Sequence, residues 1–587
     1  MHRPSPISGI RNALKTPGSA LLDLLVVAAA VSLLGGLIAY GEQFAAPLNA
    51  KTEISLSWTA LPLYTFFSLC RGFAAYAVSL AFTLAYATAA ARSRRAERVM
   101  MPVLDVLQSI PVLGFLPGLV LGMIALFPTR QIGLEIACII MIFTGQAWNM
   151  AFSFFASLKS IPTPLREAAQ VYRLPPRRVF RILEVPASMI GLVWNSMMSM
   201  AGGWFFLTVN EAFTLGDKDF RLPGVGSYMA EAINAGNAPA MLAAVAAMTI
   251  MIVAVDQLFW RPIVVWSERF KLEETAEAQK PQSWFLNLLR RSKVAEKIDA
   301  LWRKQRSRRR LSRPTRARLA PVVSGAAAPS SPARRALRWL FIVGGSIVLL
   351  WGAWSVSKLL LRLPAYDSAS GEDWLHVLLA VGATFLRTSV AVVLGGLWAL
   401  PVGVLIGLSP KWSQRLQPVV QVVASFPAPM LFPLVVLLLN AVHFPFTTGC
   451  VLLMLLGSQW YILFNVIAGA MAIPGDLKEV GRVMGTSRPK TWMRLYIPCV
   501  FPYLITGLVT AAGGAWNASI VSEYVSVKDH TYIAFGLGAI ISQATAKGNF
   551  PMLAAGVLAM AVAVVLINRL VWKRLFHLAE RRYALNA

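Results

Sequence analysis

The sequence has few charged residues, few cysteines and few histidines. Only 14% of its 587 residues are charged and 57% are hydrophobic, whereas soluble domains carry about 25% charged residues. The four cysteines show no CxxC spacing and the five histidines are scattered, so we expect no metal site; the cysteines are Cys70, Cys138, Cys450 and Cys499. Several apolar runs reach the roughly 20 residues that cross a bilayer as a helix. The composition therefore predicts an all-α polytopic membrane protein.

Motifs for enzymatic chemistry are also missing. The sequence contains no Gly-x-x-x-x-Gly-Lys-Ser/Thr phosphate loop, no HExxH and no nucleophile elbow. We therefore expect a chain that is not an enzyme and binds no cofactor itself. Its function should be the movement of a solute, with ATP and Mg²⁺ bound on a partner if ATP supplies the energy.

Acidic residues are half as frequent as basic ones, with 27 Asp and Glu against 55 Lys and Arg. Such an excess could indicate nucleic-acid binding, but the basic residues gather in short stretches between apolar runs. They lie at Arg92–Arg95, Arg166–Arg181, 267–338 and Lys573–Arg574, whereas the loop Asn210–Ala238 carries mixed charge. This placement follows the positive-inside rule. It predicts a membrane protein with both termini and the central linker in the cytoplasm, and no nucleic-acid partner.

The chain contains two copies of one pattern. Residues late in the first half recur 312 positions further on, and earlier residues recur 316 positions further on. The pairs at 312 include Glu167 and Glu479, Pro186 and Pro498, Trp204 and Trp516, Glu211 and Glu523; those at 316 are Arg71 and Arg387, Pro111 and Pro427, Pro117 and Pro433. Such a repeat predicts a duplicated domain.

Each half is predicted to cross the membrane six times, about twelve spans in total. The first six are Ala20–Tyr40, Phe73–Ala91, Met101–Phe127, Leu134–Phe154, Pro186–Leu207 and Pro239–Trp260; the second six are Leu337–Leu361, Ser389–Leu408, Pro418–Ala441, Thr448–Ala468, Pro498–Ile520 and Pro551–Trp572. Because six is even, the halves run parallel. Residues 20–40 could also form a signal peptide, but the apolar core of one usually has 7–15 residues. We expect domains at 1–270 and 337–587, joined by a linker at 271–336.

Three further segments have helical character. Residues 54–69 and 373–386 are moderately apolar and are predicted to lie as interfacial helices on the outer surface. In the linker, Trp284–Trp302 has an apolar face surrounded by Arg and Lys, which predicts an amphipathic helix on the inner leaflet. Basic and Ala/Pro/Ser-rich residues follow it. They form either a solvated tether or a specific lipid or regulatory contact.

A polar loop lies between the fourth and fifth spans of each half, at 161–186 and 473–498. Each loop predicts a short helix, a turn and a second helix that leads back to a closing Pro. Thr163-Pro164 is a favourable helix start, and the spacing of Asp476 and Glu479 resembles a capping box. Small residues after each Glu would let another protein approach closely, and Gly485 permits the left-handed backbone that ends a helix.

These loops resemble the EAA motif of ATP-binding-cassette importer permeases. Both copies keep the Glu, the spacing and the closing Pro, although Arg173 replaces the Gly in the first copy. Pro-rich segments at 108–117 and 424–433, with Gly-x-Trp…Glu at 202–211 and 514–523, are similar to nitrate/sulfonate/taurine/bicarbonate-type permeases. The resemblance implies two fused copies of the type I importer fold in a bacterial inner membrane, carrying a small anion. It also implies contact with an ABC ATPase dimer through coupling residues Glu167, Ala168, Ala169, Arg173, Glu479, Gly481 and Gly485, and a solute-binding protein on the outer face.

Polar residues inside apolar spans are candidates for the translocation path, because they are costly in lipid and usually face the protein interior. They are Gln146, Trp148, Asn149, Asn195, Trp204, Gln459, Trp460, Asn465, Trp516, Asn517 and Ser519. Each is equally compatible with a helix–helix hydrogen bond. At the outer end, Glu211 and Glu523 are expected either to pair with arginines or to face the binding protein, and Arg71 and Arg387 suit either role. The paired prolines should break the third span of each half.

An ion-coupled secondary transporter is the alternative, since such carriers also have duplicated bundles. A carrier of that class needs titratable residues buried at mid-membrane, and the sequence places almost none there. An exporter or a channel explains the two elaborate loops no better. The leading hypothesis is therefore an importer permease that works by alternating access, in contact with membrane lipids and driven by a separate ATPase.

Overall fold

The computed structural model describes residues 17–48, 52–109, 111–215, 218–270, 283–289, 332–364, 373–483, 487–527 and 530–583. The chain divides into two compact units. The smaller comprises Met1–Ile38 and Gln282–Arg362, and the larger comprises Ala39–Pro281 and Leu363–Ala587. Positions 1–16, 290–331 and Gly485 lie outside the described residues, and so does most of the predicted amphipathic helix. The expected division at 270 and 337 remains a prediction.

The smaller unit consists of apolar helices. They are α2 (Pro17–Phe44), whose last turns belong to the larger unit, α14 (Trp284–Leu289) and α16 (Pro332–Leu360). Large apolar side chains are exposed on both long helices, among them Leu34, Ile38, Leu350 and Trp351. A helix with an apolar surface that no protein covers is suited to lipid.

The larger unit holds the rest of both halves, and its elements repeat in order. The first half contains α3 (Leu61–Ala91), α4 (Arg94–Ser109), η2 (Val112–Phe115), α5 (Leu116–Leu126), α6 (Ile132–Lys159), α7 (Thr163–Val171), α8 (Pro176–Val179), η3 (Phe180–Glu184), α9 (Val185–Ala187), α10 (Met189–Asn210), β1 (Ala212–Leu215), β2 (Lys218–Arg221), α11 (Val225–Asn234), α12 (Ala238–Val255), η4 (Asp256–Trp260), α13 (Arg261–Ser267) and η5 (Glu268–Phe270). The second half contains α17 (Trp374–Leu408), α18 (Pro410–Ser425), η6 (Ala428–Met430), α19 (Phe432–Ala441), α20 (Phe446–Met471), α21 (Gly475–Val483), α22 (Arg488–Thr491), η7 (Trp492–Tyr496), α23 (Ile497–Ser522), β3 (Tyr524–Val527), β4 (His530–Ile533), α24 (Leu537–Lys547), α25 (Phe550–Ile567), η8 (Asn568–Trp572) and α26 (Lys573–Tyr583).

The offset of 312 residues found in the sequence recurs in the elements. It relates β1 to β3, α11 to α24 and α12 to α25, and it also relates the π-helical turns η3 and η4 to η7 and η8. The duplicated helical fold is therefore as the sequence predicts.

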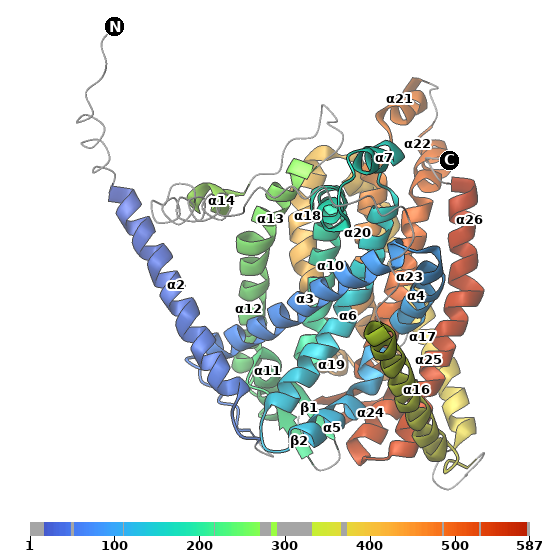
Figure 1. The fold of residues 1–587 in the computed structure, drawn as a ribbon. Coiled ribbons are helices and arrows are strands. Elements are labelled where there is room, and N and C mark those ends of the chain that lie inside the picture. Colours follow the sequence, from blue (N-terminus) through green and yellow to red (C-terminus); the bar gives the residue numbers. More distant parts are fainter. Residues whose placement is uncertain are drawn as a thin grey trace. The chain divides into compact units, whose positions relative to one another are not determined.

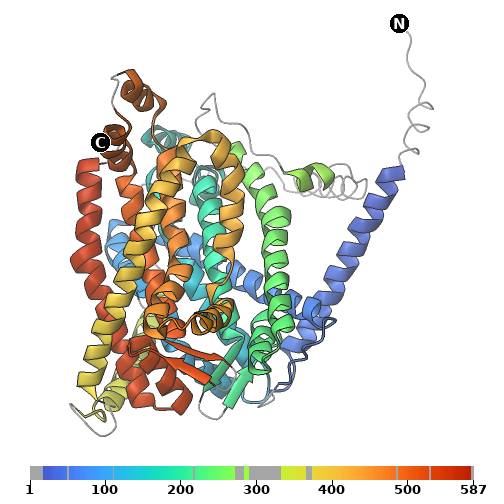
Figure 2. The same cartoon turned by 180° about the vertical axis from the view of Figure 1, so that it is seen from behind.

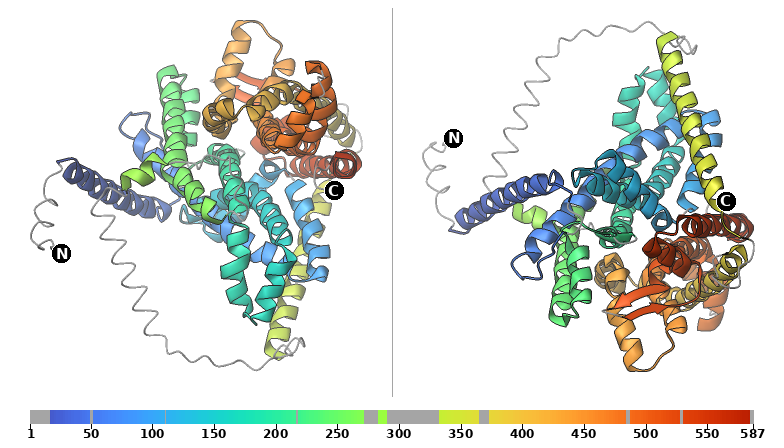
Figure 3. Two further views of the ribbon diagram at one scale, coloured as in Figure 1. Left: turned by 90° about the horizontal axis from the view of Figure 1, so that it is seen from above. Right: turned by 90° about the horizontal axis from the view of Figure 1, so that it is seen from below.

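Each half is built around a bundle of three long helices. In the first half α6 packs against α3 and α10, and in the second α20 packs against α17 and α23, so that the two bundles stand apart when seen along their axes (Figure 3). Glycine lets the helices approach closely. A Cβ on Gly72 would lie 2.7 Å from the Trp204 ring, and one on Gly407 would lie 2.5 Å from the Ala470 Cβ. Small residues at helix contacts are typical of membrane bundles.

The halves also contact each other through equivalent pairs. In one pair of equivalent contacts, η2 packs against α23 and η6 against α10. In a second pair, α4 packs against α25 and α18 against α12. Two antiparallel hairpins, β1–β2 and β3–β4, lie at one end of the larger unit, and α7, α21 and α22 lie at the opposite end (Figures 1 and 2). The fold thus places the two predicted coupling loops together and far from the hairpins.

The third span is broken, as the paired prolines predict. In the first half, Arg94–Gln108 and Val112–Leu126 meet at an angle of 82°. Pro111, just before η2, has the extended backbone of φ −60° and ψ 120°, which cannot continue a helix. In the second half, Phe426 and Pro427 are likewise extended between α18 and η6.

One expectation about helices needs correction. Residues 61–69 and 374–386 are not separate interfacial helices, because they form the first turns of α3 and α17, which run on without a break. Arg71 and Arg387 lie inside these helices and pair with buried carboxylates. By length and apolar composition, eight helices in the described residues could cross a membrane, or nine with the bent pair. The number of twelve spans stays a prediction. The helix α10 is not among the eight, since Asn195, serines and glycines lower its hydropathy.

Candidate functional site

The predicted coupling loops form two short exposed helices. In α7, Glu167 and Ala168 are exposed and Ala169 is buried against the bundle, while in α21 Glu479 is exposed. Apolar side chains are exposed beside them: Val171 is 79% exposed, Tyr172 77% and Val483 87%. Clustered exposed apolar groups on a polar helix indicate a surface for another protein. Gly481 lies within α21, and nothing tests its role or that of the other coupling residues.

Arg173 adopts the backbone conformation that the motif's glycine normally supplies. Its φ is +49°, in the left-handed region, and the amides of Tyr172, Arg173 and Leu174 donate to the carbonyls of Ala168, Gln170 and Ala169. This is the hydrogen-bonded reversal with which helices commonly end. The turn of the first loop is therefore kept despite the loss of glycine. An L-residue there costs about 1 kcal/mol or more relative to glycine.

At the hairpin end, a buried ion-pair network joins three helices of the first half. The Arg71 guanidinium makes a bidentate pair with Glu135, with both N–O distances 2.7 Å. Its third nitrogen donates to Glu211 and to the Pro223 carbonyl, each at 2.8 Å. The side chains of Arg71, Glu135 and Glu211 are all fully buried. One guanidinium thus serves two carboxylates, and its removal would leave both of them buried without a cation.

Glu211 also fixes the hairpin to the bundle. Its carboxylate accepts hydrogen bonds from the Ser68 hydroxyl at 2.6 Å and the Gly226 amide at 2.7 Å. A Cβ on Gly226 would lie 2.5 Å from the Thr208 carbonyl oxygen, and one on Gly224 would lie 2.3 Å from the carboxylate. Glycine is therefore required where the chain passes over Glu211.

The second half repeats this arrangement with one carboxylate fewer. Arg387 donates to Glu523 at 2.8 Å, and Thr384 and the Gly538 amide complete the shell. Position 447, which corresponds to Glu135, is Thr, and the Arg387 side chain stays 11% exposed. Burial raises the pKa of Glu523, which follows α23, and the Arg387 guanidinium opposes that shift.

A cavity of about 240 Å³ lies between the two halves of the larger unit, near the break in the first half's third span. Five of the predicted path residues line it: Trp148, Asn149, Asn195, Asn465 and Asn517. The helices α10, α20 and α23 contain no charged residue, so the walls contributed by these helices carry carboxamides, hydroxyls and aromatic rings beside apolar side chains and glycines. Such a lining can hydrogen-bond a small polar solute without binding it as tightly as an ion pair would.

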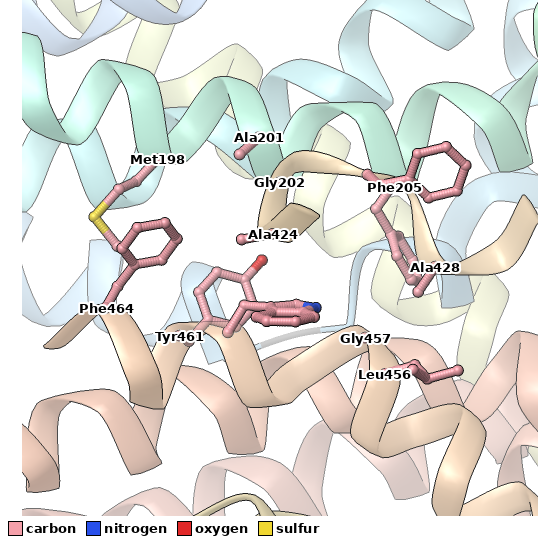
Figure 4. Close-up of a pocket in the computed structure, with 12 residues that line it drawn as sticks. Met198, Ala201, Gly202, Phe205, Ala424, Ala428, Leu456, Gly457, Tyr461 and Phe464 are labelled. Atoms are coloured by element: carbon pink, nitrogen blue, oxygen red, sulfur yellow. The ribbon is translucent and has the colours of Figure 1, made fainter. Parts of the chain in front are cut away.

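A smaller, apolar cavity of about 40 Å³ lies at the equivalent contact between η6 and α10. Figure 4 shows Met198, Ala201 and Phe205 of α10 around it, with Tyr461 and Phe464 of α20. Trp460 also lines this cavity, and Trp516 lines another one beside η8.

The remaining path candidates make contacts within the bundles. Gln146 accepts a hydrogen bond from Ser79 at 3.2 Å, Trp204 packs on Gly72, and the Ser519 hydroxyl donates to the Trp516 carbonyl at 2.8 Å. Gln459 is buried. None of these observations tests a role in transport.

Sequence reasoning missed Glu135, the serine and threonine beside each buried carboxylate, and both hairpins. Glu135 belongs to no repeated motif, because its counterpart is Thr447. One signal was present for the first hairpin: Gly216-Asp217 separates two short runs containing Phe213 and Phe220, a pair of residues that is typical of tight β-turns.

Comparison with known proteins finds the same family twice in the chain. Residues 77–259 and 399–583, together more than half of the chain, match the family described as "Binding-protein-dependent transport system inner membrane component". The chain is 26% identical to a nitrate import permease protein of Leptolyngbya laminosa over 32% of this chain and 65% of the relative. It is 30% identical to a bicarbonate transport system permease protein of Synechocystis sp. over 29% of this chain and 58% of the relative. It is 25% identical to the taurine transport system permease protein of Escherichia coli over 33% of this chain and 64% of the relative. The chain thus spans less than two thirds of the length of these relatives.

Proposed function

Because the chain belongs to the family of binding-protein-dependent transport system inner membrane components, we propose that it is the complete permease of an ATP-driven importer for a small anion. The two family domains in one polypeptide supply both halves of the translocation path. The observation that carries the proposal is the pair of exposed short helices α7 and α21, which lie at one end of the larger unit (Figure 1) and repeat one motif. One copy of the chain is then enough for each importer.

A separate ATPase dimer docks on α7 and α21 from the cytoplasm. Three features support this: the exposed Glu167 and Glu479, the neighbouring exposed apolar side chains, and the basic residues that follow each helix. By the positive-inside rule this end of the molecule is cytoplasmic, and both termini are on the same side. The solute-binding protein then docks at the opposite end, where the hairpins β1–β2 and β3–β4 are anchored by buried carboxylates.

Closure of the ATPase moves the coupling helices, and the movement opens the path alternately to each side. The π-helical turns η3 and η7 lie near the ends of the coupling loops and lead towards α10 and α23, which are two of the helices that line the cavity. A π-turn inside a helix is a frequent feature of functional sites. This continuous connection supports transmission of movement from each loop to the cavity wall.

The proposed solute class is a small anion such as nitrate, bicarbonate, taurine or another sulfonate. The transport names of the relatives support this class. The lining of the cavity is compatible with it, because carboxamide and hydroxyl groups can donate hydrogen bonds to an oxyanion.

The test is the ATPase activity of the chain co-expressed with its ATPase and binding protein, in wild type and in Glu167→Ala and Glu479→Ala. Each substitution is expected to weaken the contact between its coupling helix and the ATPase while the chain still folds. Loaded binding protein should then no longer stimulate ATP hydrolysis. Glu53→Ala, an exposed glutamate outside both loops, is the matched control and should behave as wild type. Solute movement by the chain without any ATPase would contradict the proposal and favour a secondary carrier.

A further inference from the structure

A side-chain hydrogen bond joins the broken third span of the first half to α23 of the second half, beside the packing contacts described above. The Val112 amide, freed from helical pairing by Pro111, donates to the Asn517 Oδ1 of α23 at 2.9 Å. The Asn517 Nδ2 in turn donates to the Gly513 carbonyl at 3.1 Å. Both Val112 and Asn517 line the cavity between the halves. The bond that joins the halves is therefore exposed to whatever occupies the cavity.

The equivalent contact in the other direction is apolar. The residues that correspond to Val112 and Asn517 are Ala428 and Phe205, and both line the smaller cavity at the contact of η6 with α10 (Figure 4). Phe205 has no group that can accept a hydrogen bond from the backbone of η6. The two pseudosymmetric contacts, η2 with α23 and η6 with α10, thus differ in chemistry, one polar and one apolar.

The large cavity is lined by polar side chains of both halves, among them Asn149, Asn195 and Asn465. The N–H and O–H groups here suit an oxyanion of low charge, since there is no cation on α10, α20 or α23 to compensate for a second negative charge.

We propose that Asn517 is a solute-sensitive latch. In the empty cavity its side-chain oxygen holds the Val112 amide and keeps the first half's broken span against α23. A singly charged oxyanion in the cavity takes over this amide as the stronger acceptor, and the two halves are then free to separate. Only the polar gate responds to solute, because Phe205 and Ala428 offer nothing for the anion to replace. The latch rests on the proposed importer function and adds to it the step that couples solute occupancy to gate opening.

Two substitutions at Asn517 should act in opposite directions. Asn517→Leu removes the acceptor and opens the latch without solute, so ATP hydrolysis with unloaded binding protein should rise by about 2- to 10-fold, the equilibrium effect of one hydrogen bond. Asn517→Asp, which is nearly the same shape, is a charged acceptor. It holds the Val112 amide more tightly and repels an anion, so hydrolysis with unloaded binding protein should fall about threefold or more and uptake should be lost.

The experiment uses the importer with its ATPase and binding protein in liposomes, with nitrate, bicarbonate and taurine as probes. Hydrolysis is measured with loaded and unloaded binding protein, together with uptake of each probe. Asn440→Leu is the matched control, because Asn440 is exposed on α19 and lines none of the cavities described above; it should behave as wild type. If Asn517→Leu does not fold, the isosteric Asp variant still tests the latch.

Opposite shifts in the hydrolysis of the two variants support the latch, since a merely structural role would impair both. Shifts in the same direction, or none, would overturn the latch while leaving the proposed function intact. Failure of the wild-type complex to import any probe with ATP would instead remove the proposed function, and the latch with it.

Discussion

The buried arginines of the two halves should differ in their contribution to stability, although they occupy the same position in the repeat. Arg71→Met removes four hydrogen bonds, three of them to carboxylates. It leaves Glu135 and Glu211 buried, where both are fully enclosed. Breaking a buried pair by removing one partner costs about 3–5 kcal/mol, so we expect a loss of that size in the free energy of unfolding.

Arg387→Met removes fewer interactions than Arg71→Met. Arg387 makes one ion pair, to Glu523, and that carboxylate keeps the Thr384 hydroxyl and the Gly538 amide as donors. The side chain of Arg387 is also less completely buried than that of Arg71. We expect a cost of about 1–3 kcal/mol, the range for losing a charged hydrogen bond.

The assay is equilibrium unfolding of the purified chain in mixed detergent micelles, followed by tryptophan fluorescence. Glu135→Gln in the Arg71→Met background removes one of the two buried carboxylates that have lost their cation. It should therefore recover part of the loss, about 1–3 kcal/mol in a double-mutant cycle. The reasoning would be refuted if Arg71→Met and Arg387→Met lowered the free energy of unfolding equally, or if Arg71→Met showed no coupling to Glu135→Gln. Either result would mean that the extra carboxylate does not make the loss of Arg71 more destabilising than the loss of Arg387.

Two further predictions concern the backbone. Arg173→Gly should stabilise the first coupling loop by about 1 kcal/mol, because glycine adopts the left-handed φ without strain; hydrogen exchange of the amides of 168–174 would slow, and unchanged or faster exchange would contradict the reading of the +49° φ. Gly226→Ala and Gly538→Ala should each destabilise the chain by about 1–3 kcal/mol, because the new Cβ would lie 2.5 or 2.3 Å from a backbone carbonyl oxygen. Thermal unfolding checks this, with Gly475→Ala, which meets no atom within 4 Å, as the control that should stay near wild type.

The sequence is sufficient for the architecture where a pattern is repeated or chemically unambiguous. The duplication, the short helices at 163–171 and 475–483 and the breaks after Pro111 and Pro427 all follow from residues whose backbone preferences are strong. Apolar periodicity also finds most long helices. It fails to separate a helix that begins outside the membrane from one that begins within it, because residues 61–69 are moderately apolar in either case. Hence α3 and α17 begin earlier than expected.

The site is less predictable because its key contacts are pairings between distant residues. Nothing in the local sequence of Glu135 shows that it faces Arg71, 64 residues away, and no repeat marks it. Likewise, only its polarity within an apolar helix marks Asn517 in the sequence. Its partner is a backbone amide 405 residues distant, and a backbone amide carries no sequence signal at all. Contacts of this kind depend on how the helices pack, which the sequence does not state.

The differences between the halves have a common physical origin. A permease assembled from two identical subunits must use the same residue on both sides of its path, so any polar gate would be duplicated and any extra carboxylate would appear twice. Fusion removes that constraint. In this chain the residues that correspond at the 312-residue offset are Glu135 and Thr447, Phe205 and Asn517, and Arg173 and Gly485. The backbone elements keep the same offset. These three differences, among many between the halves, lie at the contact of the broken span with α23, at the coupling turn and beside the buried arginine. Asymmetry at the first of them is what the proposed latch requires, since one half then carries the polar contact and the other the apolar one.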